Sequence, residues 1–414
     1  MRSAAFFEGL TRFSVWLLFF SVFSSASGIG AATVFLTLGF IVACRDDLRK
    51  IPSMPLFWPI VLLVAALALS TVFAQGQGFG KPLGKLRYFL FYFLLVGFFA
   101  RHPRTRVLLA RAGVGLAWVL GVVAALQFTG VFCPLVYFGF TPVPLAPFEN
   151  GAFFHARGLL YHHNPFAYTS LLLFFLLFGR AVATAGREQL ACFSGILCLV
   201  PALALSGSRG SWVALAVALT VVAARLGRGG VRLLFGILSA VAAVAVVLSR
   251  ALAERFASIH PQANPERLRL WEIAWHLFRD APLLGTGYHY GFELQRGRYM
   301  TDAEKANPFF PTDPHSLYFD LLATTGIIGT LAFLGFAGAA LKGYWNALKN
   351  EVGADERGAL VTGLGCWVAF LVGTAFDSHF FHTQTLAATL FFLAYGQSVI
   401  FQIRAGGGST RTSP

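Results

Sequence analysis

Charged residues are scarce in this sequence: they make up 12% of its 414 residues, whereas hydrophobic residues make up 57%. Soluble globular chains carry roughly a quarter charged residues. Apolar runs of about 17–22 residues recur along the chain, and each is long enough to cross a hydrocarbon layer of ~30 Å. These features exclude an ordinary soluble domain and indicate a polytopic membrane protein.

Cysteine is also rare, and the five cysteines do not form a recognisable set. Cys133 stands alone in a loop, and the others fall in or beside apolar runs, at Cys44, Cys192, Cys198 and Cys366. This distribution favours neither a disulfide framework nor a zinc site. The net charge of +14 suggests nucleic acid at first sight, but membrane topology explains most of it. We therefore expect no nucleic-acid partner.

We predict an all-α fold with about twelve transmembrane helices. The predicted spans cover residues 11–27, 29–44, 56–74, 86–100, 107–128, 165–180, 189–206, 211–227, 232–250, 317–341, 359–376 and 383–403. The first run reads as a span rather than a signal peptide, because another apolar run follows it at once. We expect one membrane domain over residues 1–414, with residues 405–414 as a disordered tail.

The basic residues predict which side each connection faces. If the N-terminus lies inside, every inner segment contains at least two basic residues, at the N-terminus, 45–50, 101–106, 180–187, 225–232, 342–357 and the C-terminal tail. The short outer connections hold few, and the loop with Lys81 and Lys85 is the one exception. The positive-inside rule therefore predicts cytoplasmic N- and C-termini.

This orientation places two larger segments outside, residues 129–164 and residues 251–316. The second is the one long polar stretch, and its acids and bases are roughly balanced. We predict that it forms a helical subdomain between spans nine and ten. Asn264 and Pro265 suit a helix start, and apolar residues follow at helical spacing, at Leu268, Trp271, Trp275 and Phe278. We expect an amphipathic helix that lies against the outer leaflet or caps a cavity.

Arginines supply the candidate anion site. Arg209 lies in the turn 206–211 between two apolar runs, with small residues on both sides and no acid nearby. A buried unpaired guanidinium is costly, so Arg209 either snorkels to water from a span end or binds an anion. Phosphate suits it, because arginine binds phosphate bidentately. Arg267 and Arg269 either supply a second phosphate contact or form a solvated helix face.

His315 is the candidate base. Asp313 and Pro314 suit a helix start, which would place His315 in the first turn of a span. A helix N-terminus disfavours the imidazolium, so we expect a neutral ring that accepts a proton near pH 7. The alternative is a histidine that merely anchors the chain at the membrane interface.

The remaining outer polar residues are less specific. Arg157 and the run His162-His163-Asn164-Pro165 end the first large outer segment. No nearby acid or cysteine completes a ligand set with these histidines, so we expect no metal site. Asp377, His379 and His382 in the last outer turn receive no role from spacing alone.

Several cations and one base on the outer face suit transfer from a lipid-linked phosphate donor. The leaving group would be a polyprenyl pyrophosphate, whose developing charge the guanidinium groups stabilise in place of a metal. The base would deprotonate an acceptor hydroxyl. The first outer loop, residues 25–30, contains no carboxylate. A mechanism without metal or cofactor is therefore the simpler hypothesis.

Three motifs resemble the O-antigen ligase and polymerase superfamily. They are Ser208-Arg209-Gly210, then Arg267-x-x-x-Trp271 followed by Pro282-Leu283-Leu284-Gly285-Thr286-Gly287, and finally Pro314-His315-Ser316-Leu317 leading to Thr325-Gly326-Ile327-Ile328-Gly329. Their order, the predicted spans and the large outer loop before the tenth span look most like the O-antigen ligases.

The resemblance implies a multi-pass enzyme of the bacterial inner membrane, among membrane lipids, with a periplasmic active site. It would transfer O-antigen polysaccharide from undecaprenyl pyrophosphate to lipid A–core, with inversion and without metal or nucleotide. By resemblance, Arg209 and Arg267 bind the pyrophosphate and His315 activates the acceptor hydroxyl. Arg157 and Asn164 match a further family position.

Three other functions remain open. An O-antigen polymerase would share the arginine chemistry but often has two larger outer loops, whereas one dominates here. A protein O-oligosaccharyltransferase usually carries an extra C-terminal region. A transporter would place charges at mid-span depth, and Asp320, the only acid clearly inside a predicted span, lies near a span end. The sequence names neither the sugars nor the oligomeric state.

Overall fold

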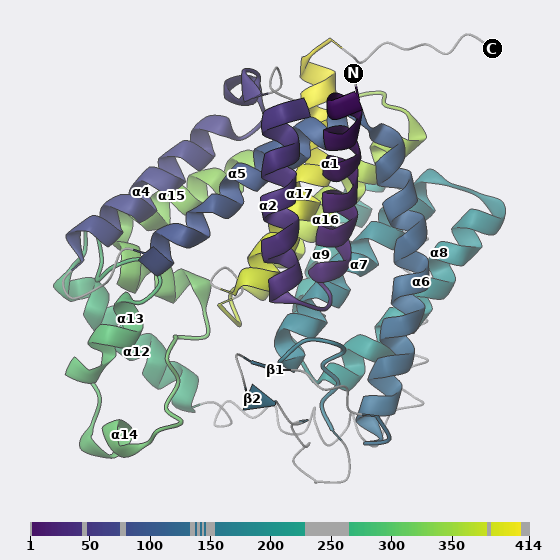
Figure 1. Cartoon of the computed structure of the whole chain (residues 1–414). Coiled ribbons are helices and arrows are strands. Elements are labelled where there is room, and N and C mark those ends of the chain that lie inside the picture. The colour runs from purple at the N-terminus through teal and green to yellow at the C-terminus, as the bar shows by residue number, and fades with distance from the viewer. Residues whose placement is uncertain are drawn as a thin grey trace.

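A computed structural model describes residues 2–43, 48–74, 80–132, 137–138, 141–142, 145, 154–227, 265–378 and 382–406. Within these residues the chain forms a bundle of long helices (Figure 1). The predicted ninth span, the first part of the polar stretch up to residue 264, and the tail from residue 407 lie outside the described residues.

Every other predicted span corresponds to a helix. In the described part of the chain these helices are α1 (Arg2–Ser21), α2 (Ala26–Ala43), α4 (Phe57–Phe73), α5 (Gly80–Arg101), α6 (Pro103–Phe128), α7 (His163–Ala183), α8 (Gly186–Ser206), α9 (Arg209–Leu226), α15 (Leu317–Ala347), α16 (Ala354–Gly373) and α17 (Thr383–Arg404). Seven of them are long and apolar enough to cross a membrane. Two-residue strands β1 (Tyr137–Phe138) and β2 (Thr141–Pro142) form one antiparallel pair. The prediction of an all-α polytopic membrane protein is confirmed.

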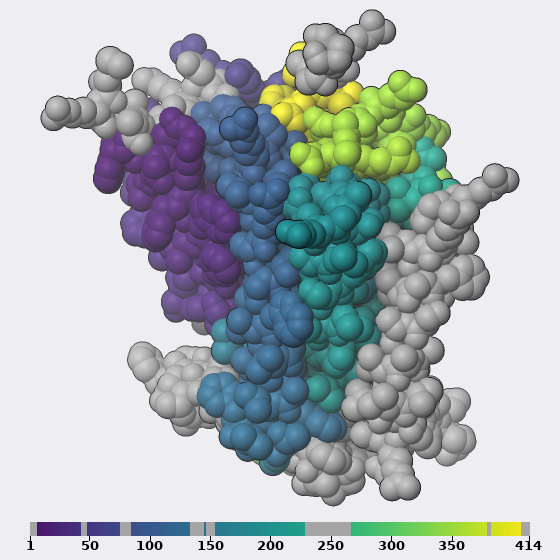
Figure 2. Space-filling view, turned by 90° about the vertical axis from the view of Figure 1, so that its right-hand side faces the viewer, coloured from purple at the N-terminus to yellow at the C-terminus, as the bar shows by residue number. Residues whose placement is uncertain are grey.

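The helices α7, α16 and α17 form the buried centre of the bundle. Small residues let α7 and α16 approach closely: a Cβ atom added at Gly179 would lie 2.4 Å from the carbonyl oxygen of Gly358. Such contacts are typical of membrane helices, which associate by backbone packing rather than by the hydrophobic effect. The helices α6 and α8 pack together on one side, beside the N-terminal helices (Figure 2).

The two ends of the bundle differ. Helix α1 begins and α17 ends at one end of the bundle, whereas the described part of the polar stretch, from residue 265, forms a small subdomain at the opposite end (Figure 1). This subdomain contains α12 (Pro265–Asp280), α13 (Gly291–Gln295), the 3-10 helix η3 (Arg296–Arg298) and α14 (Asp302–Ala306). The predicted helical subdomain before α15 is therefore present.

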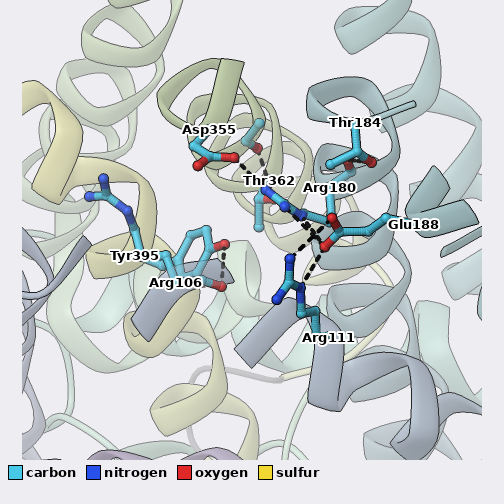
Figure 3. A network of polar contacts seen from close by, with 9 residues as sticks. Arg106, Arg111, Arg180, Thr184, Glu188, Asp355, Thr362 and Tyr395 are labelled. Atoms are coloured by element: carbon cyan, nitrogen blue, oxygen red, sulfur yellow. Dashed lines mark hydrogen bonds and ion pairs between the residues drawn. The ribbon is translucent and has the colours of Figure 1, made fainter. Parts of the chain in front are cut away.

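A network of ion pairs joins four helices near the C-terminal end of α17 (Figure 3). The Arg180 side chain, 9% exposed, binds Glu188 at 2.9 Å and also binds Asp355. Glu188 accepts a second bond from Arg111 Nε at 2.8 Å. Because these residues come from α6, α7, α8 and α16, the network fixes the positions of those helices at this end.

The subdomain is joined to a break in α15. Gly326 interrupts this helix with φ 61° and ψ −162°. The carbonyl of Ala323 accepts the backbone N–H of Thr286 at 2.9 Å, and Ile327 donates its N–H to the carbonyl of Pro282 at 2.8 Å. These bonds satisfy groups that the interrupted helix leaves without helical partners. The loop 282–287 is therefore locked onto α15.

We expect the substitution Gly326→Ala to lower the melting temperature of the purified protein. This combination of positive φ and extended ψ is essentially confined to glycine and costs other residues about 1–3 kcal/mol, and the added atom would lie 2.5 Å from the backbone of Leu283. Gly335→Ala is the matched control, since it lies in the same helix with no atom within 4 Å of the added Cβ. Scanning fluorimetry in detergent compares the two variants. Equal melting temperatures would contradict the claim that the loop 282–287 is locked onto the break in α15.

Candidate active site

His315 lies at the end of the subdomain, just before α15. The helix begins at Leu317 with Ser316 as its N-cap residue. His315 has a left-handed backbone with φ 48°, and its backbone N–H donates to Asp313 Oδ1 at 2.8 Å. The expectation that His315 lies in the first turn of a span is therefore wrong. Asp313 uses its side chain to form an Asx turn, which delays the helix start.

Two carboxylates flank the His315 ring. Its Nδ1 lies 3.4 Å from Asp313 Oδ1 and 3.7 Å from Asp377 Oδ1. The Ser378 hydroxyl donates to Asp313 Oδ1 at 3.0 Å, which ties the two acidic loops together. Hydrogen bonding to Asp377, aided by the charges of both acids, raises the pKa of His315 despite its partial desolvation. This corrects the expectation that a helix dipole keeps the ring neutral: two carboxylates outweigh it.

The acids also define which ring nitrogen is available. Because Nδ1 faces two hydrogen-bond acceptors, it carries the proton, and Nε2 keeps its lone pair. This is the arrangement in which an acid orients a histidine that acts as a general base. Sequence reasoning assigned no role to Asp377. One signal was present, since Asp377 is the only acid in the turn between the last two predicted spans.

The predicted arginines Arg209 and Arg267 belong to the same charge cluster. Arg209 is the first residue of α9, and a helix N-terminus favours bound anions. Arg267 lies on α12, half-buried, and desolvation lowers the pKa of its guanidinium. The charges that act on Arg267 are those of Asp377, Arg209 and Asp313. Arg267 is thus coupled to the carboxylates that hold His315, and the turn of Arg209 lies beside the loop of Asp377, because a Cβ atom at Gly210 would lie 2.8 Å from Phe376.

Arg157 lies in the loop before α7, and Asn164 lies in the first turn of that helix. Arg157 is 2% exposed, and its backbone N–H donates to Gln127 Oε1 at 2.9 Å. Asn164 donates its backbone N–H to Nδ1 of His162 at 3.2 Å. Their substrate-binding roles stay predictions.

Arg269 has a different environment from Arg267. It binds Glu304 at 2.9 Å, Glu272 at 2.8 Å and the carbonyl of Tyr299. The hydrogen bond from Arg269 lowers the pKa of Glu304 to about 2. Two residues along a helix correspond to roughly 200° around its axis, so Arg267 and Arg269 face opposite ways. Arg269 holds α12 to α14, and we do not assign it to phosphate.

The helix α12 is apolar on two faces. Its buried face packs against α15 with Leu270, Ile273, Ala274 and Leu277. Among the apolar residues predicted at helical spacing, Leu268 is 60% exposed and Trp275 is 47% exposed. Trp271 stacks on Phe319 at 4.9 Å and donates its indole N–H to the carbonyl of Pro314 at 3.0 Å. The helix therefore fixes the residue next to His315.

Asp313, His315 and Asp377 also present ligand atoms within 4.8 Å of one another, as a metal site would. A cation there would displace the proton on Nδ1 and would meet the positive charge of Arg267. We therefore interpret the group as hydrogen-bonded acids around a histidine.

These features define a helical membrane protein with two arginines and a carboxylate-held histidine at one end. A family model described as O-antigen ligase matches residues 194–334, which include Arg209, Arg267 and His315. Over this stretch, which is less than half of its length, the chain is similar to the O-antigen ligase family. No curated protein matches the chain. The match supports an enzyme in general and a substrate among lipid-linked polysaccharides.

We expect Asp377→Asn to change the pH dependence of the activity. Loss of the carboxylate removes the main cause that raises the pKa of His315, so the pKa falls. A base works when deprotonated, so the acid limb of kcat/KM moves to lower pH as its maximum falls. Asp302→Asn, on the exposed surface of α14, is the control. If the acid limb of Asp377→Asn did not move, Asp377 would not be the group that sets the pKa of His315.

Proposed function

We propose that the protein is an O-antigen ligase. It transfers O-antigen polysaccharide from undecaprenyl pyrophosphate to lipid A–core, and it does so with inversion and without metal. The observation that carries the proposal is the carboxylate-held His315, with the charges of Asp313, Asp377 and Arg209 all acting on Arg267. One end of a membrane protein thereby holds anion-binding groups beside a potential base.

The reaction follows from this arrangement. Nε2 of His315 takes the proton of the acceptor hydroxyl, and the oxygen attacks the anomeric carbon of the donor sugar. The bond from that carbon to the phosphate oxygen breaks, and its electrons leave with the pyrophosphate. Arg209 and Arg267 stabilise the charge that develops there. A single displacement inverts the anomeric configuration.

We place the site on the periplasmic face of the inner membrane, with both termini in the cytoplasm. The distribution of basic residues supports this orientation. The subdomain lies at the end of the bundle opposite the start of α1 and the end of α17, as this orientation requires (Figure 1). Undecaprenyl-linked O-antigen and lipid A–core would then enter from the same outer leaflet.

Purified protein tests the proposal. Undecaprenyl-pyrophosphate glycan and rough lipopolysaccharide are incubated with the protein and a chelator, and lipopolysaccharide is followed on a gel. A ligase adds the glycan to lipopolysaccharide under these conditions. Transfer that requires an added metal would contradict the metal-free mechanism.

A polymerase is the second candidate, because the same superfamily and the same arginines fit it. The donor alone distinguishes the two activities. A polymerase lengthens the lipid-linked glycan when lipopolysaccharide is absent, whereas a ligase leaves its length unchanged. Lengthened donor together with unmodified lipopolysaccharide would replace the ligase proposal with the polymerase.

A further inference from the structure

His162 caps α7 with its own ring. Its backbone is extended, and Nδ1 accepts the backbone N–H of Asn164 at 3.2 Å. A ring nitrogen that accepts a hydrogen bond carries no proton, so the proton of the neutral ring lies on Nε2. A proton on Nδ1 would face the N–H of Asn164 at the positive end of the helix dipole. The cap therefore fixes His162 as a neutral ring with an Nε2–H donor.

The surroundings of His162 favour the same state. Desolvation lowers the pKa of His162, and nearby His382 and His315 act in the same direction, whereas Asp377 opposes them. The pKa of His315 is raised instead. The hydrogen bonds assign the two roles: Nδ1 of His315 faces two acids and leaves a lone pair on Nε2, whereas Nδ1 of His162 accepts a bond and leaves an N–H group on Nε2.

A stack of imidazoles joins His162 to the turn that carries Arg209. The rings of His162 and His163 lie 4.0 Å apart, and His163 stacks on His155 at 4.6 Å. Nδ1 of the buried His155 is hydrogen-bonded to the carbonyl of Ser206 at 2.9 Å. Within this stack His162 is the exposed ring. The row of rings thus links His162 to the turn of Arg209, and the charges of Asp377 and His315 also act on it.

We propose that Nε2 of His162 donates a hydrogen bond to a phosphate oxygen of the lipid-linked donor. This inference rests on the proposed function, since it names a further group that holds the same substrate. A neutral donor adds to the hold of Arg209 and Arg267 on the pyrophosphate without adding charge repulsion between protein groups. Asn164 then acts through its backbone N–H, which fixes the ring, rather than through its side chain.

Two variants separate the ring donor from the helix cap. His162→Ser keeps an oxygen that caps α7 but removes the Nε2–H group that we propose as the donor. His162→Gln keeps an N–H group at similar reach. Native mass spectrometry measures binding of undecaprenyl pyrophosphate without glycan, and the gel assay measures transfer. A hydrogen bond to a charged group corresponds to about a 10- to 100-fold effect. We therefore expect the affinity for undecaprenyl pyrophosphate to fall by that factor in His162→Ser and by much less in His162→Gln.

The outcomes distinguish this inference from the proposed function. Wild-type affinity in His162→Ser would overturn the inference, as would an equal loss in His162→Gln at an unchanged melting temperature. Failure of the wild type to bind undecaprenyl pyrophosphate would also overturn it. If the binding results are as expected but no glycan is transferred, the His162 site is supported and the proposed ligase function is rejected. His276→Ser, in the subdomain, is the control and should bind as the wild type does.

Discussion

Replacement of His315 with alanine is expected to lower kcat for glycan transfer by roughly 100- to 10,000-fold, the range over which a general base contributes. The loss should fall on kcat rather than on KM, because the ring takes its proton in the transition state. Initial rates over a range of lipopolysaccharide concentrations, with saturating donor, separate the two constants.

His276→Ala is the matched control for this variant. His276 lies on α12 and stacks on Tyr299 at 4.9 Å, away from the carboxylates that hold His315. Its loss should leave kcat near the wild-type value. A His315→Ala protein that keeps its melting temperature and more than about a tenth of the wild-type kcat would remove His315 from the role of base.

Arg267→Ala is the second large effect. We expect kcat/KM to fall by roughly 100- to 1,000-fold, as it does when one stabilising donor is removed from a developing anion. Arg267→Lys should recover part of the activity, because lysine keeps the charge but loses the planar fork that binds phosphate bidentately. The assay follows glycan transfer at limiting donor concentration.

Arg279→Ala tests whether charge on α12 in general is sufficient. Arg279 is exposed at the last turn of the same helix. Its loss should change kcat/KM little at moderate salt, where distant surface charges are screened. An equal loss in Arg267→Ala and Arg279→Ala would assign the effect to net charge on the subdomain rather than to a bound pyrophosphate.

Apolar runs predicted the helices well because each run must match the thickness of a bilayer. The run 317–341, for example, lies within α15. The break at Gly326 was not predictable, because the apolar pattern continues through Ile327 and Ile328. What stabilises the break is the distant loop 282–287, and such a tertiary partner leaves no periodic signal.

The sequence named the cations and the histidine of the candidate site, whose roles stay predictions, but it did not predict the site's geometry. Asp313 was expected to cap a helix, yet it forms a turn and helps to hold His315. The pairing of His315 with Asp377 joins two loops that flank different helices, so no spacing rule predicts it. Sequence reasoning grouped Arg267 with Arg269, although helical periodicity places residues two apart on different sides of a helix.

The most direct test measures glycan transfer and release of undecaprenyl pyrophosphate in the same chelated reaction. The account predicts that one undecaprenyl pyrophosphate leaves for each glycan transferred, and that both signals fall together in His315→Ala and Arg267→Ala. Transfer without release of the lipid pyrophosphate, or full activity in both variants, would contradict it.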